Sequence, residues 1–129
     1  MREILFRGKR KDNDEWVEGH YGEYYNGNKN VPCISIPSKE AVSGSLCYEV
    51  ILETVGQYTG MTDKNGKKIF EHDIVRIYVD FTTMQYVISY DKENARFVVG
   101  DTGFTFWSYI STKIEVIGNI HDNPELLKE

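Results

Sequence analysis

Two of the three histidines in this 129-residue chain are each followed directly by an aspartate. A metal-dependent hydrolase could use such pairs, His72-Asp73 and His121-Asp122, because imidazole and carboxylate groups both bind divalent metals. That chemistry requires the pairs to converge with further carboxylates, and no helical spacing places them on one face. Both pairs fall in polar segments that we expect to be turns, where such side chains commonly hydrogen-bond the backbone. The sequence therefore predicts no metal, no cofactor and no catalytic residue, and we expect a protein that is not an enzyme.

The other reactive side chains also lack the patterns that catalysis needs. Cys33 and Cys47 have no second Cys or His pair at zinc-ligand spacing. Neither has an electropositive sequence neighbourhood that would activate a thiol, so we expect both to serve as small apolar residues. No serine lies in a nucleophile-elbow motif, and the glycines at 100 and 103 have the spacing of a hairpin and not of a phosphate-binding loop.

Basic residues cluster near the start of the chain. Arg7, Arg10 and Lys11 are candidates for contact with a phosphate-bearing or protein partner. The formal net charge of -5 argues against binding a polyanion with the whole surface. The alternative interpretation is that these charges keep an edge strand soluble and discourage edge-to-edge pairing.

Aromatic residues make up 13% of the chain and form the second set of binding candidates. Tyr24 and Tyr25 end a predicted strand, and Trp107 and Tyr109 share one face of another over 104–110. An exposed aromatic face could stack nucleic-acid bases or anchor a protein partner. The alternative is that both faces of 104–110 are buried, since large aromatic side chains are often simply core.

Short apolar runs separated by turn signals about every ten residues are typical of an antiparallel meander. We expect strands at 2–7, 16–25, 31–36, 46–53, 74–79, 84–90, 96–99, 104–110 and 113–120. The prolines around 31–36 place that strand near an edge, and Gly19 and Gly22 indicate a bulge or a close backbone approach. Only 123–127 has a helical pattern, with Asn123 as its N-cap.

The densest turn signal is Asp63-Lys64-Asn65-Gly66. Asn and Gly both tolerate positive φ, and an Asn-Gly pair is the strongest short hairpin signal. We therefore expect a tight, positive-φ turn here, leading through a polar corner at 71–73 to the strand at 74–79.

The block 56–76, GQYTGMTDKNGKKIFEHDIVR, resembles the signature of the YopX family, small proteins encoded by phages and prophages. The resemblance extends to 2–10, 15–19 and 116–127. His72 stands where the family usually has glycine, so we expect either an ordinary turn or a strained histidine. The resemblance implies a phage or prophage origin and a fold context, and it supplies no catalytic residues.

Together these patterns predict an all-β, mainly antiparallel fold with a short C-terminal helix. We expect an N-terminal β-sheet lobe packed on a small SH3-like barrel-type C-terminal lobe. Residues 1–129 would form a single YopX-like domain, which could divide into sublobes 1–60 and 61–129.

The function predicted is that of a non-enzymatic protein-binding module, with a host or phage protein or a second copy of the chain as partner. The alternative is nucleic-acid binding through the N-terminal basic segment and exposed aromatics. Since there is no run of about 18 apolar residues and no signal-peptide pattern, we expect the host cytoplasm as its location and no membrane contact.

Overall fold

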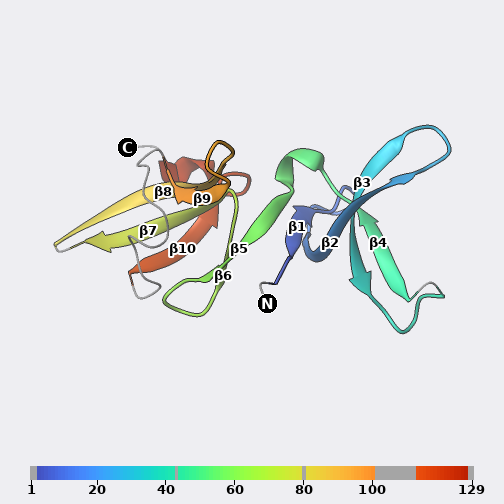
Figure 1. The fold of residues 1–129 in the computed structure, drawn as a ribbon, viewed down its shortest axis with the longest axis horizontal. Coiled ribbons are helices and arrows are strands. Elements are labelled where there is room, and N and C mark those ends of the chain that lie inside the picture. The colour runs from blue at the N-terminus through green and yellow to red at the C-terminus, as the bar shows by residue number, and fades with distance from the viewer. Residues whose placement is uncertain (1–2, 43, 80, 101–112, 128–129) are drawn as a thin grey trace. The chain divides into compact units, whose positions relative to one another are not determined.

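The computed structural model describes residues 3–42, 44–79, 81–100 and 113–127 of the 129-residue chain. The strands are β1 Phe6–Lys9, β2 Trp16–Tyr25, β3 Asn30–Pro37, β4 Ser45–Glu49, β5 Gly56–Thr62, β6 Lys68–Phe70, β7 Asp73–Val79, β8 Thr82–Asp91, β9 Arg96–Val99 and β10 Ile114–Asn119 (Figure 1). The helices of the described residues are short 3-10 turns, η1 Leu52–Thr54 and η3 Pro124–Leu127. Neighbouring strands pair antiparallel throughout. The predicted all-β, antiparallel fold class is confirmed.

The chain divides into two compact units, residues 1–57 and 58–129. In the first unit the strand order is β4-β3-β2-β1, and the first residues of β5 add to β1. Strand β2 changes partner along its length, pairing with β1 up to Gly19 and with β3 from His20 onward. A Cβ atom on Gly19 would lie 2.3 Å from the carbonyl oxygen of Ser35. The predicted close backbone approach is therefore confirmed at Gly19, whereas Gly22 faces open space.

The residues that directly follow β1 and β4 also pair, so the chain segments of these two strands meet at one end of the first unit. Arg10 and Val50 form an antiparallel bridge. The Lys11 amide donates to the Glu49 carbonyl at 2.9 Å, and the Ile51 amide donates to the Lys9 carbonyl at 2.9 Å. Since these contacts leave fewer backbone groups unpaired, they protect part of the edges of the sheet.

Strand β3 pairs with β2 on one side and with the end strand β4 on the other, so 31–36 lies near an edge of the sheet, as predicted, but is not itself the edge strand. Proline disfavours an interior strand because it lacks an N–H donor. Here Pro32 takes the accepting role, since the Val50 amide donates to the Pro32 carbonyl at 3.1 Å. A single proline thus removes one donor without interrupting the strand.

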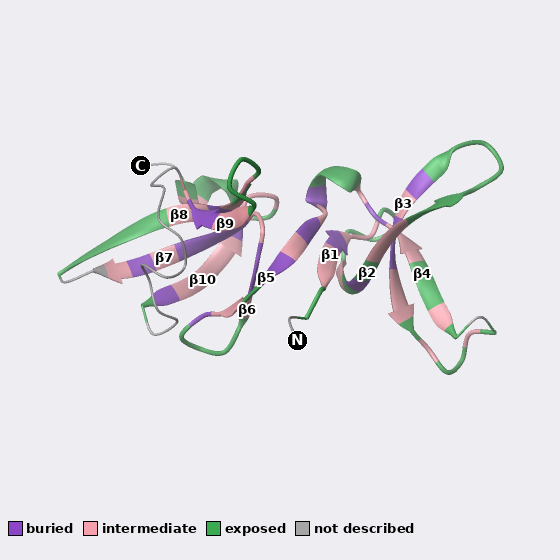
Figure 2. Ribbon diagram, viewed as in Figure 1, coloured by how far each residue is buried: buried purple, intermediate pink, exposed green. Residues whose placement is uncertain are grey.

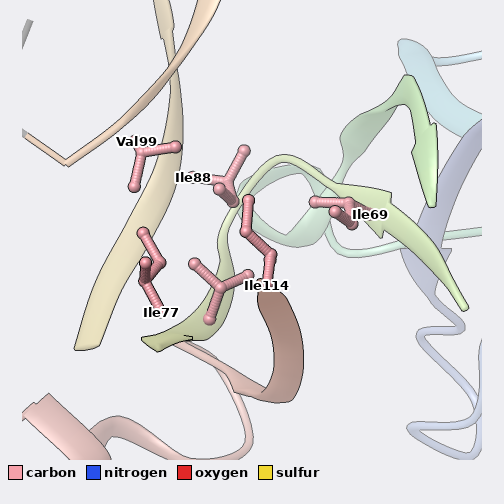
Figure 3. Packing of buried hydrophobic residues seen from close by; sticks show 6 residues of the cluster. Ile69, Ile77, Ile88, Val99 and Ile114 are labelled. Carbon is pink, nitrogen blue, oxygen red and sulfur yellow. The ribbon is translucent and has the colours of Figure 1, made fainter. Parts of the chain in front are cut away.

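The second unit contains the sheet β10-β7-β8-β9, together with the pairing of Tyr58 and Thr62 of β5 with β6. Strand alternation explains its core, because the sheet register places apolar residues of β7, β8, β9 and β10 on one face, and Ile69 of β6 packs with them. That core cluster consists of Ile69, Val75, Ile77, Ile88, Val99 and Ile114, each at most 1% exposed (Figure 3). No pairing between the end strands β9 and β10 occurs among the described residues, so the SH3-like barrel stays a prediction.

The turn between β5 and β6 is as tight as expected. Gly66 has φ of 81°, and its amide donates to the Asp63 carbonyl at 3.0 Å. The Asp63 amide in turn donates to the Lys67 carbonyl at 2.8 Å. Asn65 is not among the described residues with positive φ, so Gly66 alone takes the left-handed position, as in hairpins with a three-residue loop.

The C-terminal helix is a 3-10 turn that begins directly after Asn123, whose carbonyl accepts from the Leu126 amide at 3.1 Å, so Asn123 occupies the expected N-cap position. Its side-chain oxygen accepts from the Asn119 amide at 3.3 Å, so the side chain points back toward β10. None of the helices in the described ranges is long and apolar enough to cross a membrane.

Candidate functional site

The predicted basic residue Arg10 is already engaged by neighbours within the first unit. Its guanidinium donates to both carboxylate oxygens of Asp12, at 2.6 and 3.0 Å, and stacks 4.2 Å from the ring centroid of Tyr48. The hydrogen bond from Arg10 lowers the pKa of the Asp12 carboxyl, so the pair stays ionised in neutral solution. A carboxylate that already fills the planar fork of an arginine competes directly with a phosphate.

Lys11 and Arg7 are also held by other side chains. The Lys11 ammonium lies 3.2 Å from a carboxylate oxygen of Glu49. The Arg7 guanidinium lies 4.7 Å from the ring centroid of Trp16, in cation-π contact. The structure therefore places each of the three basic candidates against an intramolecular partner, and it compensates the charges of Arg10 and Lys11 with carboxylates.

Two pockets, of about 280 and 330 Å³, include Lys11 and Glu49 in their walls. These volumes are at or below the small end of the range of small-molecule sites. Neither pocket contains a histidine. The clustering of histidine with carboxylates that a hydrolase would need is therefore not found in either of them.

Tyr24 and Tyr25 are exposed at the end of the β2–β3 hairpin, with 41% and 65% of their surface accessible. Figure 2 shows the tip of this hairpin as exposed. Asn26 fixes the turn beyond them, because its side-chain oxygen accepts from the amides of Asn28 and Lys29 at 2.9 Å each. Because consecutive residues of a strand point to opposite faces, the hairpin presents one tyrosine on each of its faces. The other predicted aromatic candidates, Trp107 and Tyr109, lie outside the described residues.

Sequence analysis missed two exposed aromatic residues, Phe81 and Tyr90. Phe81 follows β7 in the β7–β8 turn and is fully exposed. The signal was present, since an apolar side chain in a tight two-strand connection has no core to face. A single phenylalanine in a turn belongs to no binding motif, so the sequence patterns did not mark Phe81 as a candidate.

Asp63, in the block that carries the family resemblance, is a structural residue. It is 3% exposed, and its two oxygens accept from the amides of Asn65, Lys67 and Val116 at 2.8 to 2.9 Å. Burial by itself would raise the pKa of the Asp63 carboxyl, but these backbone donors outweigh burial and lower it. Asp63 therefore holds the β5–β6 loop against β10 and has a structural role.

Cys33 and Cys47 lie on adjacent strands, diagonally across the β3–β4 pairing. Cys33 is buried, and burial, together with a hydrogen bond to Cys47, raises the pKa of its thiol to about 11. A thiol with such a pKa is protonated at neutral pH and is a poor nucleophile. This agrees with the predicted role of Cys33 as a small apolar residue, whereas Cys47 is exposed.

The two histidines that precede aspartates are brought together, which sequence analysis did not foresee. Nε2 of His121 lies 3.4 Å from Nδ1 of His72, and the ring planes are 85° apart. The aspartates take other directions, as Asp73 accepts from the Phe70 amide and Asp122 accepts from the Asn119 side chain. The described residues contain no group of three or more His, Cys, Asp or Glu side chains placed to hold a metal ion.

Comparisons with known proteins place the chain among relatives. Residues 5–128 match the model of the family described as YopX protein. The crystal structure of protein EF1440 from Enterococcus faecalis is similar, with a TM-score of 0.61 and 23% sequence identity over 99% of this chain and 100% of that chain. No curated protein sequence matches. At this level of identity the likeness to EF1440 concerns the fold alone.

Proposed function

Because the chain belongs to the YopX protein family, we propose that it is an accessory protein of phage or prophage origin that binds another protein in the host cytoplasm. The proposed contact surface is the tyrosine hairpin, defined as Tyr24 and Tyr25 on the β2–β3 hairpin. The proposal treats the protein as non-enzymatic. The proposed partner of the protein is a host or phage protein. The experiment below distinguishes this from self-association of the chain.

The observation that carries this proposal is the exposure of two neighbouring tyrosines beside a hydrogen-bonded turn. Tyrosine is enriched in the residues that dominate binding energy at protein interfaces. It offers a large apolar ring and a hydroxyl while losing little conformational entropy on binding. Hydrogen bonds that already hold the turn reduce the entropic cost of ordering the hairpin on binding.

The alternative, nucleic-acid binding, has weaker support in the same unit. Phosphate-driven affinity depends on basic groups that release counterions from the nucleic acid. Arg10 and Lys11 are each paired with a carboxylate, and the chain carries a formal net charge of -5. Binding a polyanion through these residues would require breaking their ion pairs first.

The test is affinity capture of tagged protein from host lysate, with and without nuclease, using three forms of the chain. These are the native protein, the double variant Tyr24→Ser with Tyr25→Ser, and the control Tyr90→Ser. Tyr90 has nearly the same exposure as Tyr24, 42%, and lies on β8 in the other unit. Sedimentation of the purified native protein over a range of concentrations reports self-association.

We expect a protein partner that survives nuclease, binds at least about tenfold more weakly to the double variant and binds unchanged to the control. Retention of the partner by the double variant would show that the hairpin is not the contact surface. Partners that disappear with nuclease, or whose affinity falls steeply with salt, would support nucleic-acid binding instead.

A further inference from the structure

His72 and His121 are 49 positions apart in the sequence, and their ring nitrogens lie 3.4 Å from each other in the second unit. Both imidazoles are partly exposed, so solutes can reach them. A direct hydrogen bond between ring nitrogens is optimal at about 2.9–3.0 Å. The observed separation is therefore long for a hydrogen bond.

The same separation suits joint coordination of a metal ion. Imidazole nitrogens bind Zn²⁺ at about 2.0–2.1 Å in a tetrahedral arrangement, which places two such ligands about 3.3–3.4 Å apart. The pair also uses one Nδ1 and one Nε2, and both atoms are ordinary metal ligands in proteins.

Both histidines are held in place by the backbone around them. The His72 amide donates to the Ile88 carbonyl at 2.8 Å, and the His72 carbonyl accepts from the Ile120 amide at 3.0 Å. The His121 amide donates to the side-chain oxygen of Asn119 at 3.0 Å. The two side chains therefore start from fixed positions on the turns that follow β6 and β10, as a site with prearranged ligands requires.

The backbone of His72 is unfavourable for a histidine. Its φ is 73°, in the left-handed region that favours glycine. Strain of this kind persists where surrounding structure overrides it, and it is concentrated at functional sites. A glycine at position 72 would adopt this φ without strain, but it would have no side-chain nitrogen to place beside Nε2 of His121.

We propose that His72 and His121 form a two-histidine binding site for a divalent transition-metal ion of the zinc class. The two imidazoles fill two coordination positions, and water fills the others, since the described residues supply no third ligand. Borderline metals such as Zn²⁺ are favoured by imidazole, whereas Mg²⁺ and Ca²⁺ prefer oxygen ligands. The site is independent of the tyrosine hairpin, which lies in the other unit.

The test is titration of the purified full chain with zinc chloride at pH 7.5, followed by calorimetry. Three variants accompany the native protein, namely His72→Gly, His121→Gln and the control His20→Gln. His20 is the remaining histidine and is exposed on β2, so it reports binding by an isolated surface imidazole. Glycine is chosen at position 72 because it accepts the positive φ, and so this variant should fold normally.

We expect one Zn²⁺ per chain, an affinity at least about tenfold lower in His72→Gly and His121→Gln, and no change in His20→Gln. Long-range ¹⁵N spectra of the native protein should shift at Nδ1 of His72 and Nε2 of His121 on adding Zn²⁺. The same spectra show whether each variant is folded, so that loss of binding is not confused with unfolding.

Absence of zinc binding by the native chain, or equal binding by His72→Gly, would overturn the proposal. So would a loss of binding in His20→Gln comparable to that in the other two variants. Magnesium chloride in place of zinc chloride should give no binding, because the paired ligands are nitrogen atoms.

Discussion

Asp63 shows how one residue of the chain supports two segments of the fold. Its carboxylate accepts two amides of its own turn and the Val116 amide of β10. We expect Asp63→Asn to lower the free energy of unfolding by about 1–3 kcal/mol, since the amide group replaces an ionised acceptor and turns a donor toward one of these N–H groups. Urea denaturation at pH 7 measures the change. The control is Asp12→Asn, whose side chain is exposed, and for which we expect little change.

The effect of Asp63 should also depend on pH. Because its pKa is lower in the folded protein than in the unfolded chain, its carboxylate stabilises the fold above the unfolded pKa. This contribution is lost as the pH falls through the folded pKa. The difference in stability between the native protein and Asp63→Asn should therefore shrink in acid. A difference that stays constant from pH 7 to pH 3 would show that the carboxylate charge is not what stabilises the turn.

Among the elements, the β5–β6 turn requires a positive φ at Gly66, and a substitution there can measure the energetic cost of this φ alone. A Cβ atom on Gly66 would meet no atom within 4 Å, so a substitution there adds strain without a clash. We expect Gly66→Val to destabilise the fold by about 1–3 kcal/mol because a β-branched residue is forced to positive φ. Gly66→Asn should cost less, since asparagine tolerates that conformation. Equal melting temperatures for the native protein and Gly66→Val would contradict the turn geometry.

In strand β2, the relevant feature is the narrow space between β2 and β3 at Gly19. Gly19→Ala would place a methyl group against the Ser35 carbonyl of β3 and should destabilise the protein by about 1–3 kcal/mol. Gly22 lies on the same strand with open space beside it, so Gly22→Ala is a matched control with a much smaller expected effect. Thermal unfolding of the two variants side by side separates overpacking from the general cost of replacing a strand glycine. Similar losses in both would mean that the close approach at Gly19 has no energetic consequence.

At the scale of the whole molecule, the packing of the second unit should dominate stability. Ile88 is fully buried in the core cluster shown in Figure 3. Ile88→Ala removes apolar atoms and leaves a cavity, so we expect a loss of about 2–5 kcal/mol in the free energy of unfolding. Met84 is on the same strand and is half exposed, which makes Met84→Ala the control, with an expected change within about 0.5 kcal/mol. A tolerated Ile88→Ala would show that this cluster is not a packed core.

The sequence by itself determined the features that depend on neighbouring residues. Apolar runs between turn signals predicted β2, β3, β7, β8, β9 and β10, the Asn-Gly pair predicted the turn at Gly66, and the signature block predicted the family. These succeed because side-chain direction and φ preference are local properties of the chain. The apolar runs did not predict β5 or β6, and the strand expected over 46–53 ends at Glu49, before the 3-10 turn Leu52–Thr54. The prolines predicted that 31–36 lies near an edge, but they could not show that β4 is the edge strand, because proline signals a missing donor and not which strand lies beside it.

Only the tertiary structure decided which distant side chains meet. The pairing of Lys11 with Glu49, the bond from Val116 to Asp63 and the approach of His72 to His121 join positions 38 to 53 residues apart. Such contacts depend on sheet register, and shifting a strand by one residue moves its side chains to the other face. Local patterns do not specify register between strands distant in sequence. The basic residues could therefore be found in the sequence, but the pairing of Lys11 with Glu49 and the approach of the two histidines could not.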